Sequence, residues 1–250
     1  MKQKTDLRRV GVARALSKLG FCSLAAGVEL ARAGRVRVNG VVRRDPESPV
    51  HLEKDRIDVD GRLVQENQRV YLVLNKPRGV VTTASDEKGR ETIYAYLEAD
   101  LSWVAPVGRL DKASEGLLLL TNDSEWAGKI TAPETHLDKT YHVQIAKVAD
   151  ENLLKSMASG VKTSKGILRV TRAGLLRCGE KNSWIEVVLD EGKNRQIRRI
   201  LEILGVGVLR LVRVQIGPLA LGDLKKGEVR HLTADEKHAI DQAIGRDDPG

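Results

Sequence analysis

The chain has 250 residues, of which 41% are hydrophobic and 30% charged, and its formal net charge at pH 7 is +8. This composition is typical of a globular protein with a buried core and argues against a disordered chain or a membrane protein. Its two cysteines are too few for a disulfide framework, and no spacing of cysteine and histidine matches a zinc site. No apolar stretch follows the charged first residues, so we expect a cytoplasmic protein without a secretory signal or a bound metal.

The net positive charge lies at the N-terminal end. Residues 1–44 contain 11 basic and 2 acidic residues, a net charge of +9, and the rest of the chain contains 31 basic and 32 acidic residues, a net charge of −1. A positive surface confined to one segment is typical of a protein that binds a polyanion. A solubilising tail is the alternative, but these basic residues alternate with apolar ones as they do in folded domains.

The first sixty residues predict two helices and a few short strands. Apolar residues of 10–19 share one helical face, and Gly20 ends that helix. Ser23 is the expected N-cap of a second helix that runs to Ala33. Basic and apolar residues alternate over 35–44 on both sides of Asn39-Gly40, and this pattern predicts a β-hairpin. A short strand is expected at 57–59.

The remaining chain predicts a larger domain of mixed structure. Residues 62–69 are polar and aperiodic and predict a linker, which is followed by a domain over 70–235 and a polar tail over 236–250. Strands are expected at 71–74, 116–121, 141–145, 168–171, 184–189 and 208–214, and helices at 91–97, 124–130, 150–157, 195–204 and, briefly, from Ala234. Strands predominate, so we expect an α+β fold with a mostly antiparallel mixed sheet flanked by helices.

One N-terminal segment is similar to a known RNA-binding module. Gly34-Arg-Val-Arg-Val-Asn-Gly40 resembles the most recognisable part of the domain named after ribosomal protein S-four, also called the αL motif. The second helix begins Ser-Leu-Ala-Ala-Gly-Val, without the basic residues that this family usually carries there. The resemblance implies that residues 1–61 form an RNA-binding domain. We expect four of its arginines to contact RNA: Arg8, Arg9, Arg35 and Arg37.

The segment 107–123 is the most informative part of the chain. Considered alone, Asp111 would be expected only to cap a polar turn before a buried strand. The full string Gly108-Arg-Leu-Asp-Lys-Ala-Ser-Glu-Gly-Leu-Leu-Leu-Leu-Thr-Asn122 resembles the catalytic motif of the RsuA/RluB-type ribosomal RNA pseudouridine synthases. The resemblance continues in order at 74–83, 139–141 and 191–199, and it covers essentially residues 8–235. Agreement of several motifs makes chance similarity very improbable, whereas one motif alone would be weak.

The resemblance implies that Asp111 is the catalytic nucleophile. Uridine must lose its bond from ribose to ring nitrogen, rotate, and rejoin through ring carbon 5. This isomerisation needs no redox step, group donor or metal, so no cofactor is expected. The carboxylate either attacks the sugar covalently or removes a proton from it to give a glycal-like intermediate, and the sequence leaves both routes open.

Basic residues of 191–199 are candidates for holding Asp111 in its ionised form. Alignment to the family motif makes Arg198 the expected partner of Asp111. For Lys193, Arg195 and Arg199, a solvated surface or a contact with RNA is the expected role.

Three further residues are candidates by resemblance. The tyrosine that matches Tyr141 stacks on the target base in the family, and the alternative is a tyrosine at the edge of the core. Arg109 resembles a residue that holds the flipped-out conformation, and an ordinary surface arginine is an equal alternative. We expect Lys76 to contact the RNA backbone.

The sequence therefore predicts a monomeric enzyme that isomerises uridine in ribosomal RNA, either free or within a ribosomal precursor particle. A non-catalytic RNA-binding or ribosome-assembly factor on the same scaffold is one alternative. A pseudouridine synthase that acts on transfer RNA is another.

Overall fold

The computed structural model describes residues 9–65, 67–83, 86, 88–98, 101, 103–164 and 166–245. The chain divides into two compact units. The first unit is built from 1–71, 98–105 and 121–126, and the second from 72–97, 106–120 and 127–250. Arg8, one of the expected RNA contacts, lies outside the described residues.

The N-terminal unit begins with a short strand rather than a helix. β1 (Val10–Gly11) pairs antiparallel with β4 (Pro49–Val50), so the predicted helix at 10–19 is shorter and becomes α1 (Val12–Lys18). α2 (Leu24–Arg32) begins where expected, because the Ser23 hydroxyl accepts a hydrogen bond from the backbone N–H of Ala26 at 3.0 Å. Apolar residues of these elements meet the sheet in a small core.

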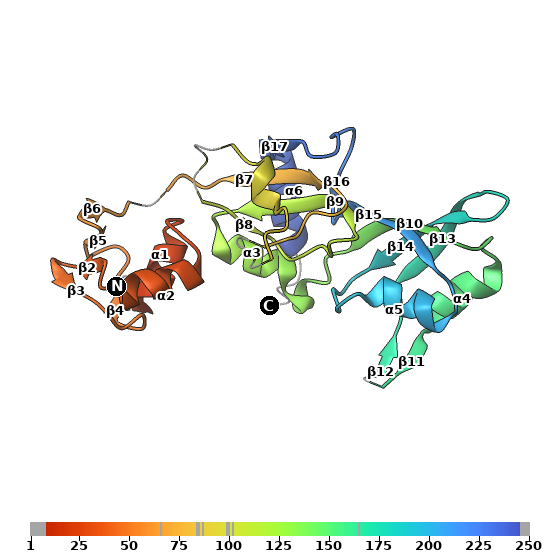
Figure 1. Cartoon of the computed structure of the whole chain (residues 1–250), viewed down its shortest axis with the longest axis horizontal. Helices are drawn as coiled ribbons and strands as arrows, with labels where there is room; N and C mark the ends of the chain where they lie inside the picture. Colours follow the sequence, from red (N-terminus) through yellow and green to blue (C-terminus); the bar gives the residue numbers. More distant parts are fainter. Residues whose placement is uncertain are drawn as a thin grey trace, which may run out of the picture. The chain divides into compact units, whose positions relative to one another are not determined.

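The sheet of this unit has the strand order β3-β2-β5-β6 (Figure 1). Its strands are β2 (Val36–Val38), β3 (Val41–Val42), β5 (Ile57–Val59) and β6 (Arg62–Leu63). Asn39 and Gly40 have φ values of +52° and +81°, as a type I′ hairpin turn requires, so the predicted hairpin is confirmed. The linker expected from residue 62 begins with strand β6 instead, because these two residues pair with β5.

The second unit contains the large sheet, in the order β13-β14-β10-β15-β9-β7-β17. In that order the strands are β13 (Arg172–Cys178), β14 (Ser183–Leu189), β10 (Lys139–Ile145), β15 (Val208–Ile216), β9 (Glu115–Thr121), β7 (Tyr71–Lys76) and β17 (Val229–His231). Short strands β8 (Ala105–Pro106) and β16 (Leu219–Ala220) pair with β9 and β15. β15 runs antiparallel to β10 and parallel to β9, so the sheet is mixed and the predicted α+β class is confirmed.

Helices α4 (Glu151–Ser159) and α5 (Gln196–Ile203) pack on one face of this sheet (Figure 1). Their apolar side chains form one core with those of β10, β14 and β15, including Val143, Met157, Ile185 and Ile200. The other helices are α3 (Ser124–Thr131) and α6 (Ala234–Ile244). α6 begins with a capping box and buries Ile240, so part of the expected polar tail is an anchored helix.

Two expected elements of the second unit differ from the structure. The helix predicted at 91–97 is a short 3₁₀ helix, η1 (Ile93–Tyr96). The strand predicted at 168–171 is wrong beyond its first residue, which ends β12 (Gly166–Leu168) in a hairpin with β11 (Val161–Thr163). The long edge strand β13 follows and was not predicted, because its residues are largely exposed and lack a clear alternation.

Within the described ranges, no helix is long and apolar enough to cross a membrane. The same residues contain no group of three or more histidine, cysteine, aspartate or glutamate side chains that could hold a metal ion.

Candidate active site

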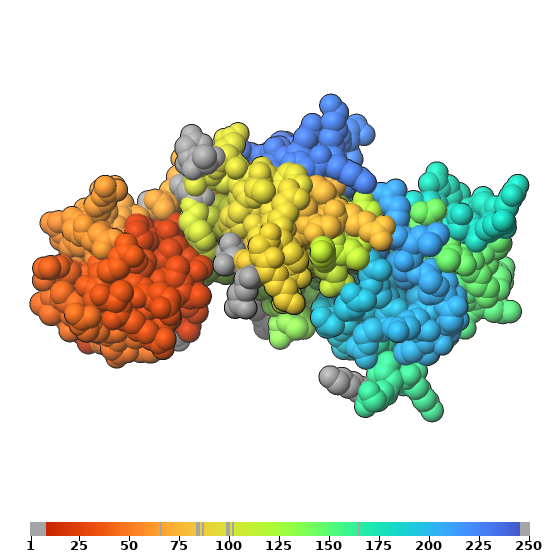
Figure 2. Space-filling view, in the orientation of Figure 1, coloured from red at the N-terminus to blue at the C-terminus, as the bar shows by residue number. Residues whose placement is uncertain are grey.

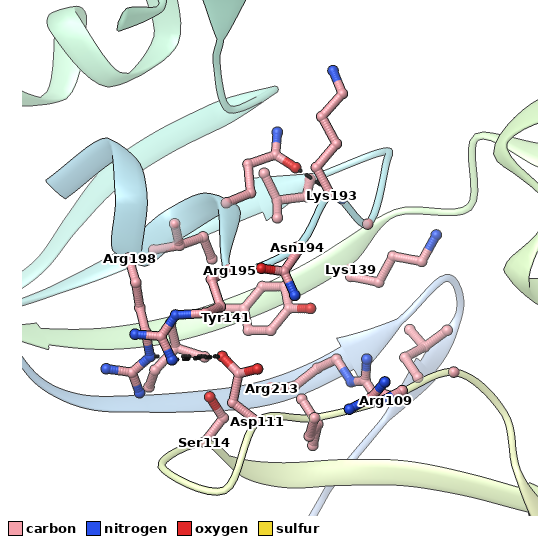
Figure 3. Close-up of a pocket in the computed structure, with 18 of the residues that line it drawn as sticks. Arg109, Asp111, Ser114, Lys139, Tyr141, Lys193, Asn194, Arg195, Arg198 and Arg213 are labelled. Carbon is pink, nitrogen blue, oxygen red and sulfur yellow. Dashed lines mark hydrogen bonds and ion pairs between the residues drawn. The ribbon is translucent and has the colours of Figure 1, made fainter. Parts of the chain in front are cut away.

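A cavity of about 400 Å³ lies in the second unit, beside the segment that leads into β9 (Figure 3). Asp111, Tyr141 and Arg198, to which the sequence analysis assigns chemistry, line it together. Its basic lining residues are Arg109, Lys139, Lys193, Arg195, Arg198 and Arg213. Asp111 is the one acidic residue of the lining among the residues that the structure describes, so a single carboxylate faces a strongly positive cavity.

Hydrogen bonds fix the backbone that carries Asp111. The carbonyl oxygens of five consecutive residues, 110–114, each accept a hydrogen bond. The hydroxyl of Thr82 donates to the first carbonyl and the backbone N–H of Gly79 to the third, both at 2.8 Å. In the space-filling view, yellow surface from residues 77–83 and 88–97 lies next to green surface of the same unit (Figure 2). The carboxylate therefore has a prepared position, which favours reaction at a bound substrate.

Lys76 is part of this support and is fully buried, with 0% of the residue exposed. Its ammonium donates hydrogen bonds to the carbonyl oxygens of Pro77 (3.0 Å), Asp111 (3.3 Å) and Ser114 (2.9 Å). Burial lowers the pKa of Lys76 to about 8, although the charges of Asp111 and Glu115 oppose the shift. The expected contact of Lys76 with the RNA backbone is wrong in this structure, because a side chain without exposed surface does not reach a phosphate.

Two arginines lie within ion-pair distance of the Asp111 carboxylate. Arg198 Nε is 4.0 Å and Arg195 Nη1 is 3.6 Å from Oδ2 of Asp111. The Arg198 side chain is 14% exposed and also donates from Nη2 to the carbonyl of Ala113 at 3.0 Å, whereas the Arg195 side chain is 51% exposed. Burial, and then the neighbouring charge of Arg195, lower the pKa of Arg198, while Asp111 raises it. Solvent screens the buried charge less, so Arg198 is the stronger partner and Arg195 a second one that we had expected on the RNA side.

Gln196, the first residue of α5, organises the loop that precedes this helix. Its side-chain amide donates at 2.8 Å to the carbonyl of Arg169 and at 2.8 Å to Oε1 of Glu191, and its oxygen accepts from the backbone N–H of Lys193 at 3.2 Å. Lys193 also forms an ion pair with Glu191 at 2.8 Å. Arg199 is half-buried and does not line the cavity. Its contact with RNA, and that of Lys193, stay predictions.

Tyr141 reaches the cavity from β10 and packs against the core beneath α4 and α5. Its cross-strand neighbour on β15 is Arg213, which in turn pairs with Gly116 of β9. Gly116 has φ +99°, and a Cβ atom there would lie 2.2 Å from the Arg213 carbonyl oxygen. Glycine is therefore required at this position for β9 to approach β15, and this approach brings the Asp111 segment to the side of the sheet that carries Tyr141.

The other expected RNA contacts are spread over both units. Arg109 is exposed at the cavity. In the N-terminal unit, Arg37 is exposed, Arg35 forms an ion pair with Asp60, and Arg9 donates to His51 Nε2 at 2.8 Å. Their contacts with RNA stay predictions.

Sequence reasoning gave no role to three lining residues, Lys139, Asn194 and Arg213. Lys139 belongs to the motif 139–141, one of those that carry the resemblance. Only the third residue of this motif, Tyr141, was given a function. Arg213 lies in a predicted strand, and the strand pattern does not reveal which neighbour it faces. Pairing register joins it to Tyr141, and register is a property of the folded sheet.

Known proteins match this chain over most of its length. The family described as RNA pseudouridylate synthase matches residues 70–202, and the S4 domain matches residues 11–57. The chain is 36% identical to ribosomal large subunit pseudouridine synthase B of Bacillus subtilis (strain 168), over 89% of this chain and 92% of that protein. It is 35% identical to an uncharacterized RNA pseudouridine synthase of Aquifex aeolicus (strain VF5), over 96% of each. A crystal structure of a pseudouridylate synthase covers 92% of this chain and 99% of its own, with 28% identity and a TM-score of 0.66.

These matches and the positively charged cavity define the class of this protein, which is an RNA-modifying enzyme. The chain belongs to the RNA pseudouridylate synthase family, and it carries an S4 domain at its N-terminal end.

Proposed function

We propose that this enzyme converts a specific uridine of ribosomal RNA to pseudouridine, with Asp111 as the reacting group. The observation that carries this proposal is the setting of Asp111, the one carboxylate among the described lining residues, on a fixed backbone within 4.0 Å of two arginines. The name of the Bacillus subtilis relative, which refers to the ribosomal large subunit, favours ribosomal RNA over transfer RNA.

The reaction breaks the bond between ribose C1′ and ring N1 and forms a bond between C1′ and ring C5, after which C5 loses its proton. The anionic carboxylate of Asp111 either bonds to C1′ and leaves again as C5 attacks that carbon, or takes a proton from the sugar and returns it as the bond between C1′ and C5 forms. Arg198 and Arg195 stabilise the anion that both routes require.

A uridine within folded RNA reaches this cavity only when its base leaves the stack. Tyr141 offers the aromatic face on which the flipped base stacks. Arg109, exposed at the cavity, is suited to bind a phosphate or to fill the vacated stack.

The S4 domain supplies a second RNA contact through exposed basic residues such as Arg37. Whether the substrate is free RNA or a precursor particle does not change the site chemistry. The monomeric state and the cytoplasmic location stay predictions.

Pseudouridine mapping tests the proposal. Ribosomal and transfer RNA from a deletion strain would be sequenced after chemical labelling of pseudouridine, and the strain would be complemented with wild-type protein or with Asp111→Asn. We expect a ribosomal uridine to lose its modification on deletion and to regain it only with the wild-type protein. Loss confined to transfer RNA would contradict the proposed substrate, and rescue by Asp111→Asn would contradict the proposed residue.

A further inference from the structure

Arg213 lines the cavity and carries a buried hydrogen-bond donor without a partner among the described residues. The residue is 5% exposed, and its Nε donates to the carbonyl oxygen of Leu117 at 2.8 Å. Nη2 is buried and has no hydrogen-bond partner among the described residues. A buried donor of a charged group that lacks a partner is unfavourable by itself. Its presence in the lining of a cavity points to a group of the substrate.

The surroundings of this guanidinium favour a negative charge. Lys139 lines the same cavity, and its pKa is lowered first by burial and then by the charge of Arg213, while Asp138 and Asp190 oppose the shift. The two cations therefore disfavour each other until an electron-rich group lies between or beside them. A guanidinium only donates hydrogen bonds, so the matching group is an acceptor oxygen.

Two kinds of oxygen in RNA are available, those of phosphates and those of bases. The phosphate backbone runs along a protein surface, where exposed cations such as Arg109 and Arg195 meet it. A flipped base, in contrast, enters a buried pocket. Arg213 is buried and is the cross-strand neighbour of Tyr141, the expected stacking residue, and Figure 3 draws both in the cavity with Asp111. The position of Arg213 therefore suits a contact with an edge of the base rather than with a phosphate.

We propose that Arg213 is a catalytic residue that donates a hydrogen bond from Nη2 to a carbonyl oxygen of the flipped uracil. The proposal rests on the proposed function. When the C1′–N1 bond breaks, its electron pair stays with N1 and spreads over the ring onto O2 and O4. Arg213 binds this anionic oxygen more strongly than the neutral carbonyl, so it stabilises the leaving ring. After rotation the ring uses an electron pair to form the C5–C1′ bond, C5 loses its proton and N1 gains one.

Replacement of the Arg213 guanidinium by an uncharged side chain gives the first test. Single-turnover pseudouridine formation would be measured at saturating concentrations of an RNA stem-loop around the mapped uridine. We expect Arg213→Met to lower the rate about 100-fold or more, as is usual for the loss of one donor to a developing oxyanion. The matched control is Arg172→Met on β13, an exposed arginine paired with Glu186 at 2.9 Å, which should leave the rate unchanged. A rate for Arg213→Met within tenfold of wild type would overturn the proposal.

Binding of a modified RNA separates a base contact from a phosphate contact. The same stem-loop with an abasic residue at the target position keeps every phosphate and lacks the uracil. We expect Arg213→Met to bind the abasic RNA as tightly as wild type does. An equal loss of affinity for the uridine and abasic RNAs would assign Arg213 to a phosphate and overturn the proposal.

Arg213→Lys covers the case in which the methionine variant does not fold. Lysine keeps the positive charge and can donate to Leu117, but its single nitrogen cannot also place a donor at the position of Nη2. We expect a folded protein at least tenfold slower than wild type, and a wild-type rate would overturn the proposal. If wild-type protein itself forms no pseudouridine, the proposed function fails instead, which the mapping experiment detects independently of Arg213.

Discussion

Arginines of the N-terminal unit and the cations that support the Asp111 segment in the second unit lie in opposite environments. Arg35 and Arg37 are exposed on the small sheet of the S4 domain. Lys76, Arg198 and Arg213 are largely or fully buried around the Asp111 segment, with their donors directed at carbonyl oxygens, at Asp111 or into the cavity. Exposed cations bind the RNA polyanion in a salt-dependent way, whereas buried cations act at fixed positions with little screening. We propose that exposed arginines of the N-terminal unit contribute affinity for RNA, whereas the buried cations around Asp111 support the chemistry.

Replacement of Asp111 should separate the two roles most completely. Asp111→Asn keeps the shape of the side chain and removes the anion, so pseudouridine formation should fall below detection, a loss of about 10³-fold or more, or about 4 kcal/mol of barrier. RNA affinity should persist, because the cations of both units are unchanged. Filter binding and single-turnover assays on the same preparation measure both quantities. Activity within tenfold of wild type would contradict the role of Asp111.

Lys76 provides a test by protein stability. Its pKa falls from 10.5 to about 8 in the folded protein, so between these values the unfolded chain binds more protons and the free energy of unfolding rises with pH. The free energy of unfolding is therefore about 3 kcal/mol higher above pH 10.5 than below pH 8. This extra stability is lost as the pH falls from 10.5 through 8. Lys76→Met should lack this rise and should also have low activity, because the Asp111 segment loses its support. Urea unfolding from pH 7 to 10.5 measures the difference, and identical pH profiles would argue against a buried ammonium.

Arg198→Met should reduce the rate about 100-fold, because Asp111 loses its buried cation. Arg198→Lys should retain more activity, because a point charge still stabilises the anion. Arg195→Met, which removes the more exposed partner, should have the smaller effect on the rate at saturating RNA. If Arg195→Met lowers the saturated rate more than Arg198→Met does, the two roles are exchanged.

The smallest effect on chemistry is expected from the S4 domain. Replacing exposed Arg37 and Arg43 by glutamine in the full chain should weaken RNA binding and reduce the slope of log affinity against log salt by about one for each phosphate that is no longer bound. The rate at saturating RNA should be unchanged. A comparable double replacement of exposed Lys155 and Lys162, in the second unit, serves as the control. An unchanged salt slope would mean that these arginines do not bind RNA.

Local signals in the sequence predicted local structure well. The Ser23 cap and the Asn39-Gly40 turn act through neighbouring backbone atoms, so they are readable from adjacent residues. β13 was missed because an exposed edge strand has no buried face to impose alternation.

Side-chain environment and strand register were the parts that the sequence could not reveal. Lys76 follows the predicted strand at 71–74, as many surface lysines follow strands, but it ends β7 and its ammonium donates to carbonyl oxygens of the Asp111 segment. Arg213 belongs to the site because β10 and β15 pair in one register. The closeness of Arg195 to Asp111 depends on its left-handed backbone, with φ +50°, ahead of α5. Motif similarity identified the Asp111 segment, but the cations around it come from distant segments that only the fold brings together.

Salt dependence of the wild-type reaction tests the division between binding and chemistry most directly. Pseudouridine formation by the purified protein on its ribosomal RNA stem-loop would be followed over a range of salt concentrations, with RNA affinity and the rate at saturating RNA measured at each. We expect affinity to fall steeply with salt while the saturated rate stays nearly constant, because Lys76, Arg198 and Arg213 are largely or fully buried. A saturated rate that falls as steeply as the affinity, or no pseudouridine at any salt concentration, would contradict this division.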